Sequence, residues 1–155
     1  MSLFNEQVRT PSNRYKLMKI VAHIKLPAQL EYLQKFIDFV ASCSREQGFE
    51  KKRVHEIELA TEEALVNIFN YAYKETNGYV EIICKLDDNK RFIIEIVDTG
   101  IAFNVLSVTA PDISADISER QLGGLGVFLI KEVMDEVLYR YEDNKNKLSL
   151  IIDKR

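Results

Sequence analysis

Hydrophobic and polar residues alternate with a period of two in several stretches of the chain. The two clearest, residues 79–86 and 91–98, read YVEIICKL and RFIIEIVD, and a short polar link separates them. Such alternation predicts strands, and the short link predicts a hairpin. A looser alternation over residues 15–26 predicts another strand, and the runs on either side of residues 143–146 predict a second hairpin.

Between these stretches the apolar residues recur at helical spacing. Residues 30–40 carry apolar side chains three or four positions apart, directly after Pro27, a residue favoured in the first turn of a helix. Gly48 is placed to end this helix in a left-handed conformation. Two further helices are predicted over residues 51–73 and 125–137. The apolar stripe of the first consists of Ile57, Ala60, Ala64, Ile68 and Ala72.

The order of these elements predicts the fold class. A strand, two helices, two strands, a helix and two strands are typical of an α+β protein, here a two-layer α/β sandwich. We expect a mixed, mostly antiparallel sheet with the helices on one face. The 155 residues fit a single domain, which we assign to residues 15–155. Residues 1–14 are polar and aperiodic, and we expect them to form a flexible arm.

Composition and charge exclude several classes of function. The 21 basic and 24 acidic residues give a net charge of −3 without a basic block, which argues against direct binding of nucleic acid. No apolar run approaches the roughly 20 residues of a membrane-spanning helix, and the first residues lack the apolar stretch of a signal peptide. We therefore expect a cytoplasmic protein without membrane contact. Cys43 and Cys84 have no metal-ligand spacing and are expected to be small buried hydrophobes.

The first cluster of candidate chemistry lies on the predicted helix 51–73. Glu63 and Asn67 are four residues apart and share a helix face at the border of the apolar stripe, where polar groups need partners. The amide oxygen of Asn67 suits a hydrated Mg²⁺ ion, and Glu63 suits a general base. The alternative for this cluster alone is a solvated helix face with an interior asparagine.

The second cluster ends the predicted strand 91–98. Period two places Asp98 on the same face as Ile94 and Ile96, so the strand delivers a carboxylate to the end of an apolar layer. A carboxylate only accepts hydrogen bonds, and the exocyclic amine of adenine would supply one. Gly100 lets the backbone approach closely. The alternative is an Asp-Thr-Gly turn that closes the strand.

The third cluster consists of Gly123, Gly124 and Gly126, which precede an apolar helix. Backbone amides at a helix N-terminus can bind an anion. The pattern lacks the GK[ST] of a P-loop and does not follow a strand as the dinucleotide fingerprint does, so a glycine-rich hinge is the alternative. Together the clusters match one scheme: a metal helix, an adenine aspartate, a mobile loop within the irregular residues 99–122, and phosphate glycines.

The three clusters resemble the N, G1 and G2 boxes of the gyrase/histidine-kinase ATPase superfamily. Within it, the chain resembles the anti-sigma-factor serine/threonine-protein kinase family of bacteria. The family pattern E-A-x-x-N-x-x-x-H-A-Y is met by Glu63, Ala64, Asn67, Ala72 and Tyr73. The pattern DxGxAF is met by Asp98, Gly100, Ala102 and Phe103. The run GGLGVFLIKEVMDEVLYRYED extends the resemblance past the glycines into the next helix and strand.

The resemblance implies an ATP-binding sandwich of the Bergerat type. It makes Glu63 the catalytic base, Asn67 the Mg²⁺ ligand and residues 104–122 the ATP lid. Ser149 would lie near the adenine, where the family's last strand carries Thr or Ser. The implied ATP-binding residues are Asn67, Asp98, Gly100, Ala102, Phe103, Gly123, Gly124, Leu125, Gly126, Val127 and Ser149. One departure is Tyr71, a larger side chain that stands where the family usually has His.

The resemblance also implies partners. Members of the family phosphorylate a serine of a small anti-anti-sigma protein (STAS domain), bind a sigma factor, and are usually homodimers. Two alternatives stay open: an ATP-binding regulatory module that sequesters a partner without phosphoryl transfer, and a histidine-kinase catalytic domain separated from its receptor. The presence of both Glu63 and Asn67 favours an enzyme over the module. The absence of a dimerisation-helix histidine disfavours the receptor fragment.

Overall fold

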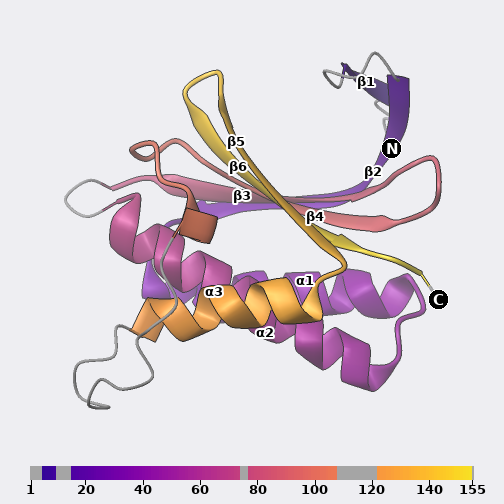
Figure 1. Cartoon of the computed structure of the whole chain (residues 1–155), viewed down its shortest axis with the longest axis horizontal. Helices are drawn as coiled ribbons and strands as arrows, with labels where there is room; N and C mark the ends of the chain where they lie inside the picture. The colour runs from indigo at the N-terminus through magenta and orange to yellow at the C-terminus, as the bar shows by residue number, and fades with distance from the viewer. Residues whose placement is uncertain (1–4, 10–14, 74–76, 108–121, 155) are drawn as a thin grey trace.

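The computed structural model describes residues 5–9, 15–73, 77–107 and 122–154 of the chain. Two layers are visible in Figure 1: a twisted sheet, and three long helices that lie together against one of its faces. The predicted α+β sandwich with helices on one face is therefore confirmed. The other face of the sheet carries no helix in this part of the chain.

Six strands form the sheet in the order β1-β2-β3-β4-β6-β5. Every pairing among the described strands is antiparallel, so the parallel component expected of a mixed sheet does not occur there. The reason lies in the connections. Two hairpins, β3–β4 and β5–β6, pair neighbours in sequence, and the β5–β6 hairpin enters the sheet through β6 beside β4. The strands are β1 Asn5–Arg9, β2 Tyr15–Pro27, β3 Tyr79–Leu86, β4 Phe92–Asp98, β5 Glu136–Glu142 and β6 Lys145–Ile152.

The helices are α1 Leu33–Glu46, α2 Lys51–Tyr71 and α3 Leu122–Val133, with short 3₁₀ turns η1 Leu30–Tyr32 and η2 Val105–Ser107. Gly48 has φ of +88°, which confirms the predicted left-handed end of α1. None of the described helices combines the length and low charge needed to cross a bilayer. The apolar faces of the helices and of the sheet form one core, whose fully buried members include Phe36, Ile57, Leu65, Ile82, Ile94, Ile130 and Leu150.

Three boundaries differ from the sequence prediction. Pro27 is the last residue of β2, where it pairs with Tyr79, and the first helix begins six residues later. The second helix ends two residues before the predicted end. The third begins three residues before the predicted start and ends four before the predicted end, because its C-terminus turns directly into β5. The phosphate glycines therefore lie inside α3 rather than before it.

The expected flexible arm over residues 1–14 contains a strand. Residues Asn5–Arg9 form β1, in register with residues 15–19 of β2. An unpaired β2 would leave its outer N–H and C=O groups at the edge of the sheet, and β1 pairs with them through the backbone. Backbone pairing needs no side-chain period, so hydropathy alone did not reveal this strand. The remaining residues of the predicted arm lie outside the described ranges.

Candidate functional site

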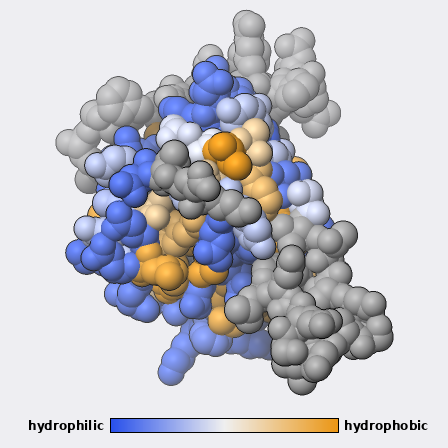
Figure 2. All heavy atoms as spheres, turned by 90° about the vertical axis from the view of Figure 1, so that its left-hand side faces the viewer, coloured by the Kyte–Doolittle hydropathy of each residue, from blue (hydrophilic) through white to orange (hydrophobic). Residues whose placement is uncertain are grey.

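The candidate residues gather at one end of the two layers. The register pairs Val80 with Asp98 and Asp98 with Asn146, so β3 begins, β4 ends and β6 begins at this end. The backbone N–H of Ile101 donates to the carbonyl of Ala72 at 3.1 Å, which joins the loop after β4 to the end of α2. This is the left-hand end of Figure 1, and Figure 2 views the molecule from that side.

Asn67 is buried in α2, and the described residues pair only part of its side-chain amide. Its side chain is 1% exposed, and its Nδ2 donates to the carbonyl of Glu63 at 2.8 Å. No hydrogen bond from the described residues reaches its Oδ1 atom. A buried acceptor without a donor costs free energy, and a hard cation can bind such an oxygen. Asn67 thus fits a role as Mg²⁺ ligand.

The described residues do not form a complete set of protein ligands for a cation. The described residues contain no group of three or more His, Cys, Asp or Glu side chains close enough to hold a metal. An ion at Asn67 would therefore have to complete its shell with water and phosphate oxygens. This is how Mg²⁺ usually binds together with a nucleotide.

The carboxylate of Glu63 lies against α3. A methyl group added at Gly126 would sit 2.1 Å from Glu63 Oε2 and 2.8 Å from its Cδ, so only glycine permits this approach. Burial raises the pKa of Glu63, and the neighbouring Glu62 raises it further. A raised pKa brings a carboxylate closer to the range useful for a general base. Gly126 therefore allows the glycine-rich start of α3 to lie directly against Glu63 on α2.

The other residues of the glycine segment have different positions. Gly123, Gly124 and Leu125 lie in the first turn of α3, where backbone N–H groups have no partner inside the helix. That placement keeps an anion site possible. The side chain of Val127 is 3% exposed and belongs to the hydrophobic core.

Asp98 ends β4 with a carboxylate held through one oxygen. Its side chain is 2% exposed, and Oδ1 accepts from Gly100 N at 3.0 Å and from Asn146 Nδ2 at 2.9 Å. Burial raises the pKa of Asp98, and the two hydrogen bonds act in the opposite direction. In the described part of the chain no donor reaches Oδ2. The carboxylate therefore has one free acceptor, as the adenine role requires.

The turn after Asp98 is held by close contacts with the end of α2. A methyl group at Gly100 would sit 2.4 Å from the backbone carbonyl of Ala72, which confirms that this glycine permits a close backbone approach. The hydroxyl of Tyr73 accepts from Thr99 N and donates to the carbonyl of Tyr79, both at 2.8 Å. Tyr73 thus connects α2, β3 and the turn.

Tyr71, the departure from the family pattern, stacks on Phe103. The ring centroids lie 4.9 Å apart with an interplanar angle of 23°. The larger ring at this position thus packs against a residue of the predicted ATP-binding set. Ala102, beside Phe103, is exposed. Of the predicted lid, η2 and the start of α3 are described, whereas residues 108–121 lie outside the described ranges.

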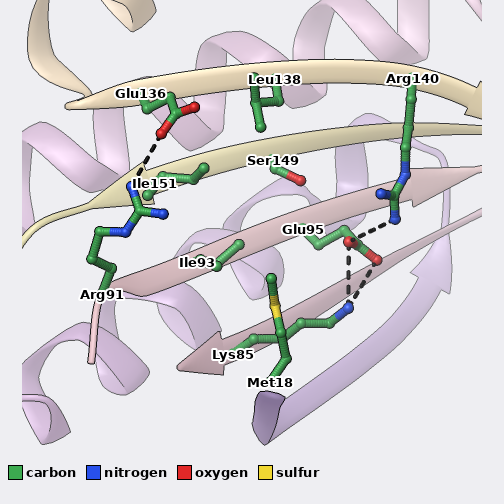
Figure 3. A pocket seen from close by; sticks show the side chains of 10 residues that line it. All are labelled: Met18, Lys85, Arg91, Ile93, Glu95, Glu136, Leu138, Arg140, Ser149 and Ile151. Atoms are coloured by element: carbon green, nitrogen blue, oxygen red, sulfur yellow. Dashed lines mark hydrogen bonds and ion pairs between the residues drawn. The ribbon is translucent and has the colours of Figure 1, made fainter. Parts of the chain in front are cut away.

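Ser149 does not belong to this site. Leu148 and Leu150 occupy the core face of β6, so Ser149 between them points to the opposite face of the sheet. Figure 3 shows it lining a pocket there, together with Lys85, Glu95 and other residues. The expectation of Ser149 near the adenine is therefore wrong.

Asn146 is the site residue that sequence reasoning missed. It is 3% exposed and donates to Asp98, yet the sequence analysis placed it in a turn. The turn is shorter, since Asp143 and Asn144 carry the positive φ angles of 56° and 60°. Counting back from Ile152 by twos through Leu150 and Leu148 reaches Asn146 on the core face. The same period-two reasoning that selected Asp98 would have found it.

Apolar side chains are exposed on the end face that carries the site. Figure 2 shows orange, hydrophobic residues among hydrophilic ones on this face. Three exposed hydrophobic side chains lie next to this end of the sheet: Leu30 after β2, Tyr79 at the start of β3 and Ile101 after β4, and Phe128 is exposed on α3; all four are between 56% and 65% exposed. Large exposed apolar side chains are typical of surfaces that bind another protein.

Comparison with known proteins decides the family. Residues 26–152 match the histidine kinase-like ATPase domain, HATPase_c_2. Serine-protein kinase RsbW of Bacillus cereus (strain AH820) is 31% identical over 129 residues, which cover 81% of this chain and 80% of the relative. The chain belongs to the anti-sigma-factor serine kinase family of histidine kinase-like ATPases. The resemblance seen in the sequence is thereby confirmed.

Two further similarities agree with this membership. RsbW of Bacillus thuringiensis (strain Al Hakam) is 30% identical over the same share of both chains. The crystal structure of the SiaB–SiaC complex from Pseudomonas aeruginosa contains a chain with a TM-score of 0.62 and 12% identity, covering 86% of this chain and 89% of that one. At that identity the structure supports the fold alone. Members of this kinase family share the domain that the described residues form.

Proposed function

We propose that this protein is an ATP-dependent serine kinase that phosphorylates a small anti-anti-sigma protein of the STAS type. The observation that carries the proposal is that Asn67 Oδ1 and Asp98 Oδ2, both buried at the same end of the sandwich, accept no hydrogen bond from the described residues. One suits the cation that accompanies a triphosphate and the other suits the amine of adenine. Similarity to RsbW kinases supports the same activity.

Each residue would have a distinct part in the transfer. The serine hydroxyl of the partner attacks the γ-phosphorus, the bond from that phosphorus to the bridging oxygen of ADP breaks, and Glu63 accepts the hydroxyl proton. Asn67 would hold the Mg²⁺ ion, which neutralises charge on the phosphates. Asp98 would hold the base, and the backbone amides of Gly123 and Gly124 in the first turn of α3 would contact phosphate oxygens.

Nucleotide binding should require some rearrangement at this end of the molecule. Asn67 and Asp98 are 1% and 2% exposed, so a ligand can touch them only if the residues that cover them shift. We expect the start of α3 to move, because α3 approaches α2 through Gly126 rather than through a large interlocking side chain. The exposed Ile101 and Phe128 would then face the partner protein.

A phosphotransfer assay with the cognate STAS protein tests the kinase. Glu63→Gln should still bind ATP but transfer phosphate 10²- to 10⁴-fold more slowly, the usual share of a general base. Asn67→Ala should lose both binding and transfer, because the cation ligand is gone. Glu58→Gln, which neutralises another carboxylate on the same helix, is the matched control and should stay active. Full activity of Glu63→Gln would contradict the assigned base.

The alternative module without catalysis has a different outcome in the same experiment. Tight ATP binding by the wild type with an unmodified partner, checked by intact-mass spectrometry, would favour a nucleotide-regulated binding protein. Binding of a sigma factor, a homodimer and a cytoplasmic location stay predictions. Co-purification with and without ATP, and light scattering after size exclusion, measure the first two.

A further inference from the structure

Asn146 uses all of its side-chain hydrogen-bonding capacity at the end of β4. Its Nδ2 donates to Asp98 Oδ1 and to the carbonyl of Ile101, both at 2.9 Å. Its Oδ1 accepts from Phe103 N at 2.9 Å and from the hydroxyl of Tyr139 at 2.6 Å. One buried amide therefore joins β4, the turn after it and β5.

These partners determine the orientation of the amide. Turning the group by 180° would place its oxygen against Asp98 Oδ1 and the Ile101 carbonyl, and its NH₂ against the N–H of Phe103. The hydrogen bonds to Asp98, the Ile101 carbonyl and Phe103 N would then be lost in a buried site, where each unmade bond is costly, and only the Tyr139 hydroxyl could still pair, by accepting from the turned NH₂. Asn146 is therefore held as a donor toward Asp98.

Tyr139 holds the amide from the far side. Its phenol is partly buried, and burial together with the nearby charge of Asp98 raises its pKa, so it remains a protonated donor at neutral pH. A donor is what Asn146 Oδ1 requires. Asp98, Asn146 and Tyr139 form a continuous chain of hydrogen bonds from β4 through β6 to β5.

These hydrogen bonds make the two carboxylate oxygens of Asp98 different from each other. Both donors, Asn146 Nδ2 and Gly100 N, reach the same oxygen, Oδ1. They favour the ionised carboxylate and leave Oδ2 as a single acceptor of fixed direction. An ionised acceptor binds the 6-amino group of adenine and repels the 6-carbonyl oxygen of hypoxanthine or guanine.

We propose that Asn146, supported by Tyr139, is a positioning residue that aims the free oxygen of Asp98 at the base and so sets the preference for adenine over 6-oxopurine nucleotides. This inference rests on the proposed nucleotide binding. It assigns no contact with the nucleotide to Asn146 itself. Its effect passes through the charge and direction of Asp98.

Titration calorimetry with ATP and ITP, each with Mg²⁺, tests the inference, because ITP replaces the 6-amino group with a carbonyl. Asn146→Asp keeps the shape of the side chain and the oxygen that accepts from Phe103 N and from the Tyr139 hydroxyl. It replaces the NH₂ group with a second carboxylate oxygen facing Asp98, and two carboxyl groups at this distance share a proton. The ATP-to-ITP affinity ratio should fall by about tenfold or more, while affinity for ITP is kept or rises. Tyr139→Phe should lower the same ratio by a smaller factor.

Tyr141→Phe is the matched control, since Tyr141 lies two residues along β5 and is 46% exposed. The ATP-to-ITP affinity ratio of this variant should equal that of the wild type. Should Asn146→Asp fail to fold, as judged by thermal unfolding, Tyr139→Phe decides the question. An unchanged ratio in the folded variants, or an equal loss of ATP and ITP affinity, would overturn the inference alone. A wild type that binds neither nucleotide would overturn the proposed function as well.

Discussion

At the scale of single residues, the site consists of polar groups that the fold buries without full compensation. Asn67 and Asp98 each keep one oxygen without a donor from the described residues, although both are almost inaccessible to water. Such groups reduce stability, and proteins retain them where a ligand supplies the missing partner. Asn146 is the contrast, because all of its hydrogen bonds are made within the protein.

Replacing Asp98→Asn should make stability less dependent on pH. Because burial raises the pKa of Asp98, the native state holds the proton more tightly than the unfolded chain. The stabilisation from this group is complete below the ordinary carboxyl pKa of about 4 and is lost as pH rises through the raised native value. The variant should therefore gain stability relative to the wild type at neutral pH, measured by urea unfolding at several pH values.

The same variant should lose ATP affinity in calorimetry, because its neutral amide presents no charged acceptor to the base. A wild type that becomes more stable relative to Asp98→Asn between pH 4 and pH 7 would show that the native pKa of Asp98 is lowered instead. The stability and the affinity are therefore expected to change in opposite directions at one position.

At the scale of elements, two glycines bring the parts of the site together for different reasons. Gly100 brings the turn after β4 against the backbone of α2, and Gly126 brings α3 against the side chain of Glu63. Tyr73 adds hydrogen bonds from the end of α2 to the turn and to the start of β3. At the end of the molecule away from the site, Arg53 near the start of α2 forms an ion pair with Asp135, which follows α3, at 2.9 Å.

Alanine at these two glycines should have different effects. In Gly100→Ala the new methyl group meets the Ala72 carbonyl at 2.4 Å, and a backbone group held in place cannot move aside. We expect a loss of about 1–3 kcal/mol in the free energy of unfolding, measured in urea. In Gly126→Ala the methyl group meets the flexible end of Glu63, and alanine gains up to about 1 kcal/mol in helix propensity.

Gly126→Ala should therefore keep its stability but transfer phosphate more slowly, since Glu63 is displaced from its position. Each variant serves as the control for the other, because both add one methyl group near α2. Equal losses of stability would contradict the distinction between a backbone neighbour and a side-chain neighbour.

At the scale of the whole molecule, the two faces and two ends of the sandwich differ in chemistry. The candidate site shares one end with the exposed Leu30, Tyr79 and Ile101. The face of the sheet opposite the helices carries the buried Lys85–Glu95 ion pair, 3.4 Å between charged atoms (Figure 3). The proposed kinase activity requires the nucleotide and the protein substrate to meet at the same place. We therefore expect the partner to bind the end seen in Figure 2.

Phe128→Ser should weaken that binding. Phe128 is 57% exposed on α3, so its loss removes apolar contact area without opening a cavity in the core. The KM for the STAS protein should rise about tenfold while the affinity for ATP stays unchanged, measured by phosphotransfer at varied partner concentration. Leu138→Ser, which removes a 52% exposed side chain from the opposite face of the sheet, is the matched control. A similar rise in both variants would exclude the end face as the docking surface.

Much of this protein was predictable from local sequence patterns. Period two identified β3, β4 and the inward direction of Asp98, and helical spacing identified α1 and α2, because one face of each element is buried and its residues repeat accordingly. The family motifs predicted the nucleotide site. β1 was missed because backbone pairing leaves no hydropathy signal, and Ser149 was misplaced because a motif position does not state which face of a strand it occupies.

By itself, the sequence determined the layers, the candidate carboxylates on their elements and the family, since all of these depend on residue types at fixed spacing. Only the tertiary structure decided which groups meet: that Asn146 orients Asp98, that Gly126 lies against Glu63, and that Tyr71 stacks on Phe103. These contacts join residues from 32 to 63 positions apart, and their geometry depends on how the helices pack on the sheet. No local pattern contains that information.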